Sequence, residues 1–296
     1  MEEQTSKPRG LRKDYSGYIY ILPATLSLII FAIVPIGMAI YFSFTKYNVI
    51  QPASWIGLKN YVRLPKDPYM KAAVRNTLLY TLMQVPLTTV LSMMVATLIT
   101  AQRRSHFIGA VKSIMFIPEI SSMILVGTLW RIMYNPQTGL INQLLNLVGL
   151  PSVNWLGTSA MALPSIAIVG IWKNVGYFMV IYIAAILEIP SDLYEAAAID
   201  GASGWQQFRY ITMPRLKPTT YMVVILCTIW SFQVFDLAFT MTGGGPGKAT
   251  TTLVYIIYTS AFRDYNMGYA CAMAMFLFAI IIVISTVQRW LLRERD

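Results

Sequence analysis

Three long stretches of this sequence contain no charged residue. They cover residues 15–45, 76–102 and 265–288, and each is longer than the roughly 20 residues with which an α-helix crosses a bilayer. Only 12% of all residues are charged and 56% are hydrophobic, whereas about a quarter of the residues of a soluble domain are charged. The sequence therefore predicts an integral membrane protein.

Three further apolar stretches contain a few ionisable residues. We place these spans near residues 107–134, 161–189 and 218–241. Because hydrocarbon offers no partner to backbone N–H and C=O groups, each span is expected to be a helix that pairs its own backbone. The predicted fold class is an all-α polytopic protein with six transmembrane helices.

The distribution of Lys and Arg predicts that both termini are cytoplasmic, because cytoplasmic segments are enriched in these residues. The tails 1–14 and 291–296 are then inside, and the inner segments contain Lys7, Arg9, Arg12, Lys13, Arg103, Arg104, Arg209, Arg215, Lys217, Arg289, Arg293 and Arg295. The outer loops contain fewer: Lys46, Lys59, Arg63, Lys66, Lys71, Arg75, Lys248 and Arg263. The net charge of +10 is thus spread over several membrane-flanking segments, which favours contact with anionic lipid over nucleic-acid binding.

Metal and disulfide chemistry finds little support in the sequence. Cys227 and Cys271 lie in apolar spans, where a reduced thiol behaves as a small hydrophobic group, and His106 is the one histidine. We therefore expect neither a metal site nor a catalytic site.

The polar segment 190–218 between two apolar spans carries its own helix signals. Pro190 is expected to end the preceding helix, Asp192 to cap the next one, and Glu195 to complete a capping box. The alanines that follow favour helix, and Gly201 supplies a stop.

A second helical piece is expected after this glycine. Ser203 can cap it, and Pro214 is expected to end it. Between them, apolar side chains recur at helical spacing: Trp205, Phe208 and Ile211. The segment either packs on the ends of the protein's own helices or docks on another protein.

Two features are expected on the outer side. Residues 139–149 predict an amphipathic helix of about three turns, which lies on the membrane surface or packs under an external partner; its apolar face consists of Leu140, Leu144, Leu147 and Val148. The glycine cluster around Lys248 superficially matches a phosphate-binding loop, but Thr242 stands where the first glycine is required and Ala249 where Ser or Thr is required. We expect a tight turn there.

The pattern of the polar segment resembles a family signature. An acidic residue, two alanines, a glycine after three further residues, and then Ile and Pro are similar to the cytoplasmic loop of permease subunits of bacterial ATP-binding-cassette importers; the matching residues are Glu195, Ala196, Ala197, Gly201, Ile211 and Pro214. Other segments resemble the carbohydrate-uptake branch of this family: 171–177, 184–190, 231–236, 242–246, Asn76-Thr77 and 139–142. The likeness runs from about residue 15 to 290 and is greatest to the larger maltose-permease subunit and to glycerol-phosphate permeases. The large extra outer domain of some maltose permeases is missing.

The resemblance implies the type I importer permease fold, with a first helix at 15–45 and a permease core at 72–290, in a bacterial inner membrane. It also implies a subunit that forms half of a translocation path for a sugar, an oligosaccharide or a related polyol or glycerol phosphate. Expected partners are a second homologous permease subunit, a dimer of ATPase subunits that hold ATP and Mg²⁺, and an extracellular solute-binding protein, while this chain binds no cofactor and is not an enzyme. The expected ATPase-coupling residues are Glu195, Ala196, Ala197, Asp200 and Gly201.

Four ionisable residues lie inside predicted spans, where such residues usually face a cavity or a bundle interior: Glu119, Arg131, Lys173 and Asp236. Polar and aromatic residues near them offer the hydrogen bonds and ring faces that a sugar needs, and with Asp236 they form the expected solute path: Asn174, Tyr177, Trp230, Gln233 and Phe235. The alternative is that these side chains pair helix to helix, with Glu119 beside a helix break at Pro118.

Two other classes of protein were weighed. An ion-coupled secondary transporter also buries charges between apolar helices, but it usually shows internal repeats with matching broken spans, and none is evident here. A membrane enzyme needs a cluster of catalytic or metal-binding residues near one interface, and the scattered acids and single histidine argue against one.

Overall fold

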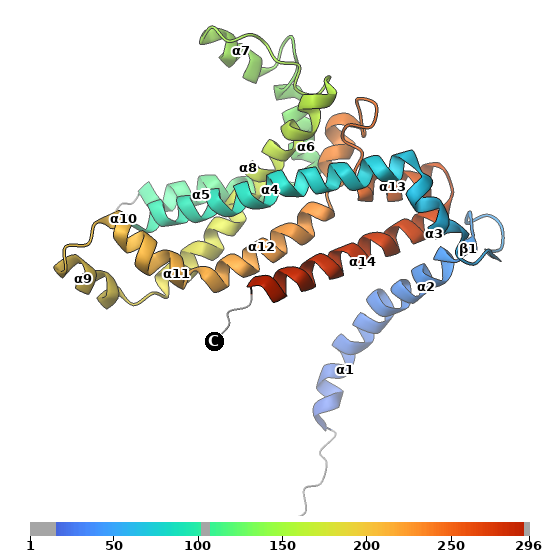
Figure 1. Ribbon diagram of the computed structural model, residues 1–296, viewed down its shortest axis with the longest axis horizontal. Coiled ribbons are helices and arrows are strands. Elements are labelled where there is room, and N and C mark those ends of the chain that lie inside the picture. Colours follow the sequence, from blue (N-terminus) through green and yellow to red (C-terminus); the bar gives the residue numbers. More distant parts are fainter. Residues whose placement is uncertain (1–15, 102–106, 293–296) are drawn as a thin grey trace, which may run out of the picture.

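The computed structural model describes residues 16–101 and 107–292. Its long helices run along one another between two ends of the molecule, one marked by α9 and the other by β1 and α3 (Figure 1). These long helices are α4 (Pro68–Ala101), α8 (Ser159–Leu187), α12 (Lys217–Phe232) and α14 (Met267–Leu292). Since the helices are apolar over most of their length, the architecture is the all-α polytopic one that the sequence predicts.

The N-terminal arm diverges from this bundle (Figure 1). It consists of α1 (Ser16–Leu28), the π-helical turn η1 (Ile29–Ile33) and α2 (Val34–Ser43). A two-stranded antiparallel sheet follows, in which β1 (Thr45–Lys46) pairs with β2 (Ser54–Trp55). The chain then reaches α4 through α3 (Lys59–Arg63) and the 3₁₀ turn η2 (Leu64–Lys66).

Four helical stretches in the described part of the chain are long and apolar enough to cross a bilayer: Tyr20–Ser43, Pro68–Thr100, Ser159–Leu187 and Met267–Leu291. A fifth apolar region is the pair α5 (Phe107–Ile120) and α6 (Met123–Met133), bent by 105° at its break. The predicted span at 107–134 is therefore broken. Ser122 adopts an extended conformation there, and Pro118 lies in the last turn of α5 and has no N–H to donate.

The predicted span at 218–241 is also interrupted. α12 has 16 residues and ends at Phe232, and a separate π-helical turn, η4 (Ala238–Thr242), follows. The last turn of α12 tightens, because the N–H of Gln233 donates to the carbonyl of Trp230 at 3.1 Å. The polar segment between α12 and η4 is thereby released from the helix.

Shorter elements connect the long helices. α7 (Leu140–Leu147) lies between α6 and α8. The connection between α8 and α12 consists of α9 (Ser191–Ile199), α10 (Gly204–Gln207), η3 (Phe208–Thr212) and α11 (Met213–Arg215). α13 (Leu253–Tyr258) and the π-helical turn η5 (Thr259–Arg263) precede α14.

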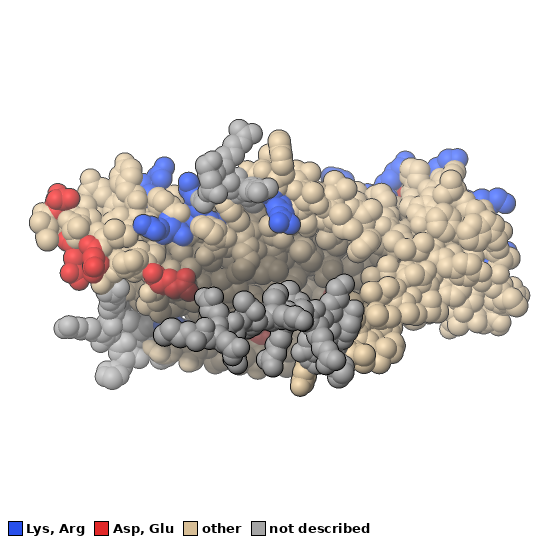
Figure 2. Space-filling model, turned by 90° about the horizontal axis from the view of Figure 1, so that it is seen from below, with Lys and Arg blue, Asp and Glu red and all other residues tan. Residues whose placement is uncertain are grey.

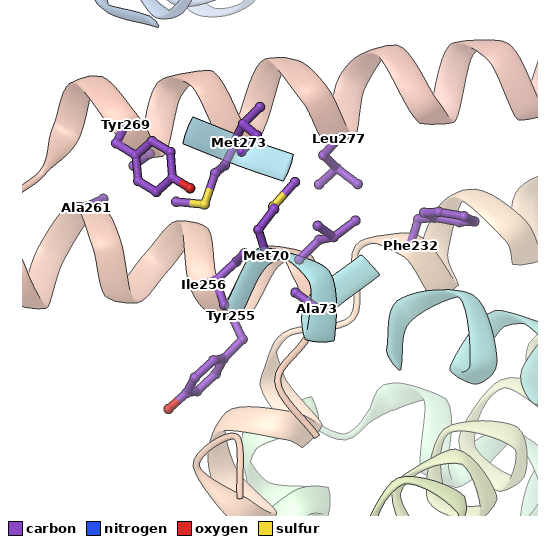
Figure 3. Close-up of a cluster of buried hydrophobic side chains, with 12 residues drawn as sticks. Met70, Ala73, Phe232, Tyr255, Ile256, Ala261, Tyr269, Met273 and Leu277 are labelled. Carbon is purple, nitrogen blue, oxygen red and sulfur yellow. The ribbon is translucent and has the colours of Figure 1, made fainter. Parts of the chain in front are cut away.

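Buried apolar side chains hold α4, α13 and α14 together near the β1 end. Figure 3 shows Met70 of α4 beside Met273 of α14, which is flanked along its helix by Tyr269 and Leu277. A second cluster joins α4, α8 and α12 toward the α9 end and includes Phe178. The helices are therefore packed at both ends of the bundle.

The glycine-rich segment after η4 forms a tight turn, as predicted. Gly243, Gly244 and Gly247 all have positive φ, a conformation that glycine adopts without a steric penalty. The side chain of Asn76 donates to the carbonyls of Lys248 and Thr251 at 2.7 and 3.0 Å. This turn is thus fastened to the first half of α4.

Candidate functional site

The helix α9 begins without the cap that the sequence suggested. Pro190 occupies the N-cap position, no side chain accepts a hydrogen bond there, and Asp192 already lies within the first turn. The predicted capping box of Asp192 and Glu195 is therefore wrong, because Ser191 is already helical. Asp192 still stabilises the positive end of the helix dipole.

The end of α9 matches the prediction closely. Gly201 has a φ of +78°, its N–H donates to the carbonyl of Ala198 at 3.1 Å, and the N–H of Ala202 donates to that of Ala197 at 2.8 Å. These two bonds form a Schellman motif, which satisfies carbonyls at the helix end. Gly201 is thus the stop that was expected.

The second helical piece is capped by Ser203, as predicted, and Gln206 completes the box. The Ser203 N–H donates to Oε1 of Gln206 at 2.7 Å, and Ser203 Oγ accepts from the Gln206 N–H at 3.4 Å. The prediction that Pro214 ends this piece is wrong, since the helical run continues to Arg215. Pro214 lies in the first turn of α11, where a missing N–H costs little.

One hydrogen bond ties the two pieces together. The hydroxyls of Tyr194 in α9 and Thr212 in η3 lie 2.8 Å apart, and Thr212 is buried. The neighbouring Leu216 is fully buried against the bundle. The hairpin is therefore anchored on its η3 side.

The α9 side of the hairpin is open. Glu195, Ala196, Asp200 and Gly201 are exposed, Ala197 is half-buried, and α9 has no buried residue. Large apolar side chains also face outward: Ile199 is 88% exposed, Trp205 69% and Tyr210 74%. Figure 1 shows α9 beyond the ends of the long helices, and Figure 2 shows acidic side chains gathered at the same end. The alternative in which α9 packs on the protein's own helix ends does not describe this arrangement.

A second candidate site is an open cavity of about 310 Å³ between α4, α5, α8 and the segment that follows α12. It is lined by five of the six predicted solute-path residues: Asn174, Trp230, Gln233, Phe235 and Asp236. Tyr177 does not line it but packs against Trp230, with ring centroids 5.0 Å apart. The interruption after α12 supplies three of these lining residues.

An ion pair between buried Lys173 and half-buried Glu119 borders the cavity. The Nζ of Lys173 on α8 lies 3.4 Å from a carboxylate oxygen of Glu119 and 3.3 Å from the Glu119 carbonyl oxygen. Glu119 stands one residue before the end of α5, so the alternative of a helix-to-helix pair beside a break describes it well. Arg131, in contrast, lies exposed in the last turn of α6, so its expected interior position is wrong for the described residues.

Sequence reasoning missed the two lining residues that α4 contributes. Tyr80 and Gln84 lie one turn apart on α4, and both are almost fully buried. Gly170 of α8 makes room for them, because a Cβ at this position would collide with the Tyr80 hydroxyl. The sequence feature that could have identified them is their helical spacing within the charge-free run 76–102, which places both on one face of the helix.

Comparison with known proteins now identifies the family. Residues 70–295 match the family model described as binding-protein-dependent transport system inner membrane component. The chain belongs to this family. The probable ABC transporter permease protein YurN of Bacillus subtilis is 35% identical to this permease over 274 residues, which are 92% of this chain and 94% of YurN.

Other relatives agree. The trehalose/maltose transport system permease protein MalF of Thermococcus litoralis is 33% identical over 287 residues, 96% of this chain and 95% of that protein. The crystal structure of a bacterial ABC transporter involved in the import of the acidic polysaccharide alginate contains a chain that is 26% identical, with a TM-score of 0.83 and 96% of each chain covered. The permease fold inferred from the sequence is thus confirmed. Family membership sets aside the secondary transporter and the membrane enzyme.

The predicted amphipathic helix is present and is shortened to the eight residues of α7. The apolar face with Leu144 and Leu147 is exposed, while Asn142 is buried and holds the surrounding loop. Asn142 accepts hydrogen bonds from the Val153 N–H at 3.1 Å and from the Trp155 indole at 3.0 Å. The helix is therefore fixed by its polar side.

Proposed function

We propose that this permease forms half of the translocation path of an ATP-driven importer in a bacterial inner membrane, with ATP and Mg²⁺ bound by separate ATPase subunits. A second permease subunit completes the path, and an extracellular solute-binding protein delivers the solute. The family description, which names a binding protein and an inner membrane, supports this assembly.

The observation that carries the proposal is the exposed hairpin of α9. Driving a two-state transporter from 1:99 to 99:1 takes about 5.5 kcal/mol of differential interaction, and a rigid helix in a groove transmits such a displacement. α9 ends in a Schellman motif, is anchored through Tyr194 and has no buried residue. We assign ATPase coupling to Glu195, Ala196, Ala197, Asp200 and Gly201.

Charge indicates the chemistry of the partner groove. Asp192, Glu195 and Asp200 are all exposed on or beside α9, and α9 has no basic residue in its last turn. An ATPase surface that receives this helix is therefore expected to be basic, with an apolar site for Ile199.

A saccharide is the solute class that the cavity and the relatives support. The cavity combines aromatic rings, Trp230 and Phe235, with the polar side chains of Asn174, Gln233 and Asp236, a combination that suits a polyhydroxylated ring. Of the relatives described above, one is named for trehalose and maltose and one for the acidic polysaccharide alginate.

Substitution of Gly201 tests the coupling assignment. A Cβ at Gly201 meets open space within this chain, so Gly201→Val acts through the left-handed backbone and through whatever protein approaches it. In the reconstituted importer we expect Gly201→Val to abolish both uptake and solute-stimulated ATP hydrolysis while the protein still inserts. Gly201→Asn, which tolerates positive φ, separates the backbone effect from crowding by the ATPase.

Gly57 provides the matched control. It has a φ of +61° and open space around it, but it lies in the loop between β2 and α3, so Gly57→Val is expected to retain coupling. Transport by Gly201→Val at the parental rate would refute the coupling assignment.

A further inference from the structure

A large apolar groove lies beside the first turns of α4, apart from both sites described above. Its volume is about 810 Å³. The walls come from α3, η2, α4 and α14, and they include Leu64, Met70, Val74, Leu78, Leu79 and Phe276. Almost all of the lining surface is carbon, so the groove offers few partners to a peptide backbone.

Two cations stand at the rim of this groove. Lys71 and Arg75 are exposed and lie one helical turn apart on α4, on the face that continues to Leu78 and Leu79. Neither lies within ion-pair distance of a carboxylate in residues 16–101 and 107–292. Two positive charges therefore remain uncompensated above a hydrocarbon-like surface.

The groove lies at the depth of a membrane interface. The charge-free run of α4 begins at residue 76, directly after Arg75, and Tyr61 lines the same groove. Tyr is common where the hydrocarbon meets the headgroups. At the other end of the groove, away from the charge-free run, Met70 packs beside Met273 of α14 (Figure 3).

We propose that this groove binds one anionic phospholipid, with its phosphate on Lys71 and Arg75 and an acyl chain along Leu78, Leu79 and Phe276. A phospholipid suits both parts of the site, because it joins an anionic phosphate to hydrocarbon in one molecule. Phosphatidylglycerol keeps one net negative charge beside a hydroxylated headgroup, whereas in zwitterionic lipids an ammonium group offsets the phosphate.

Native mass spectrometry of the full-length chain, purified together with its companion subunits, tests the site. After delipidation, the complex is titrated with phosphatidylglycerol or with phosphatidylcholine. We expect the parent to retain phosphatidylglycerol preferentially. Lys71→Gln/Arg75→Gln should weaken that retention about thirtyfold, the factor that about 2 kcal/mol from two cations represents.

The matched control replaces two exposed lysines that lie outside the groove. Lys46→Gln/Lys59→Gln lowers the net charge by the same amount on residues that do not line the groove, so it should leave retention unchanged. Leu78→Trp fills the groove without changing its charge and should reduce retention of both lipids.

A photo-reactive side chain at position 78 identifies the occupant directly. Cross-linking to phospholipid supports the proposal. Cross-linking to the companion permease subunit, equal retention of the two lipids by the parent, or undiminished retention by Lys71→Gln/Arg75→Gln would each overturn it.

Discussion

At the scale of single residues, Lys173 and Glu119 illustrate what a charge costs inside a membrane protein. Lys173 is 6% exposed, and its ammonium group relies on Glu119. Glu119→Gln leaves a buried cation without a counter-ion and should lower the free energy of unfolding by about 3 kcal/mol. Glu119→Gln/Lys173→Met removes both charges and should cost less than the sum of the single changes.

Unfolding of the detergent-solubilised chain, measured for both single variants and the double variant, checks this coupling. Additive losses of stability would show that the two side chains do not depend on each other.

The same residues show where sequence reasoning at this scale succeeds. Lys173 and Glu119 stand out because charges are rare in apolar spans. Tyr80 and Gln84 do not stand out, since a single uncharged polar residue in a membrane helix is common. Arg131 was misplaced because the exposure of its side chain depends on tertiary packing.

At the scale of elements, the cap of α10 offers a sharp test. Ser203→Ala removes one of the two reciprocal hydrogen bonds that begin this helix and should cost about 1 kcal/mol. The local consequence is faster hydrogen exchange at the Gln206 amide. Asp192→Ala is the comparison, because Asp192 makes no capping hydrogen bond in α9 and acts only through the helix dipole, so its loss should accelerate exchange less than Ser203→Ala does. Equal acceleration in both variants would contradict this assignment of caps.

The hairpin also shows which element boundaries are encoded locally. Gly201 and Ser203 were predictable because their roles depend on their own backbone conformation and on neighbours within a few residues. The start of α9 was not, since it depends on how the chain leaves α8. The interruption after Phe232 was missed because no glycine or proline marks it in 219–241. Gln233 and Asp236, which follow the break, line the cavity.

At the scale of the whole molecule, hydropathy determines the fold class because a bilayer admits few alternatives to helices. It does not determine how the helices lean. The N-terminal arm is nearly as apolar as α14, yet its apolar window has 0% of its residues buried. α2 contacts α14 while α1 lies apart from the bundle (Figure 1), an arrangement that hydropathy alone does not predict.

Orientation in the membrane is the whole-molecule property that remains a prediction. Ser203 lies in the α9 hairpin and Ser152 lies in the loop after α7, and both are exposed. In a chain whose two cysteines are replaced by alanine, a membrane-impermeant maleimide applied to spheroplasts should label Ser152→Cys and not Ser203→Cys. Permeabilised cells should give labelling at both positions, which controls for reactivity. Labelling of Ser203→Cys in intact spheroplasts would place α9 outside, where no ATPase subunit could reach it.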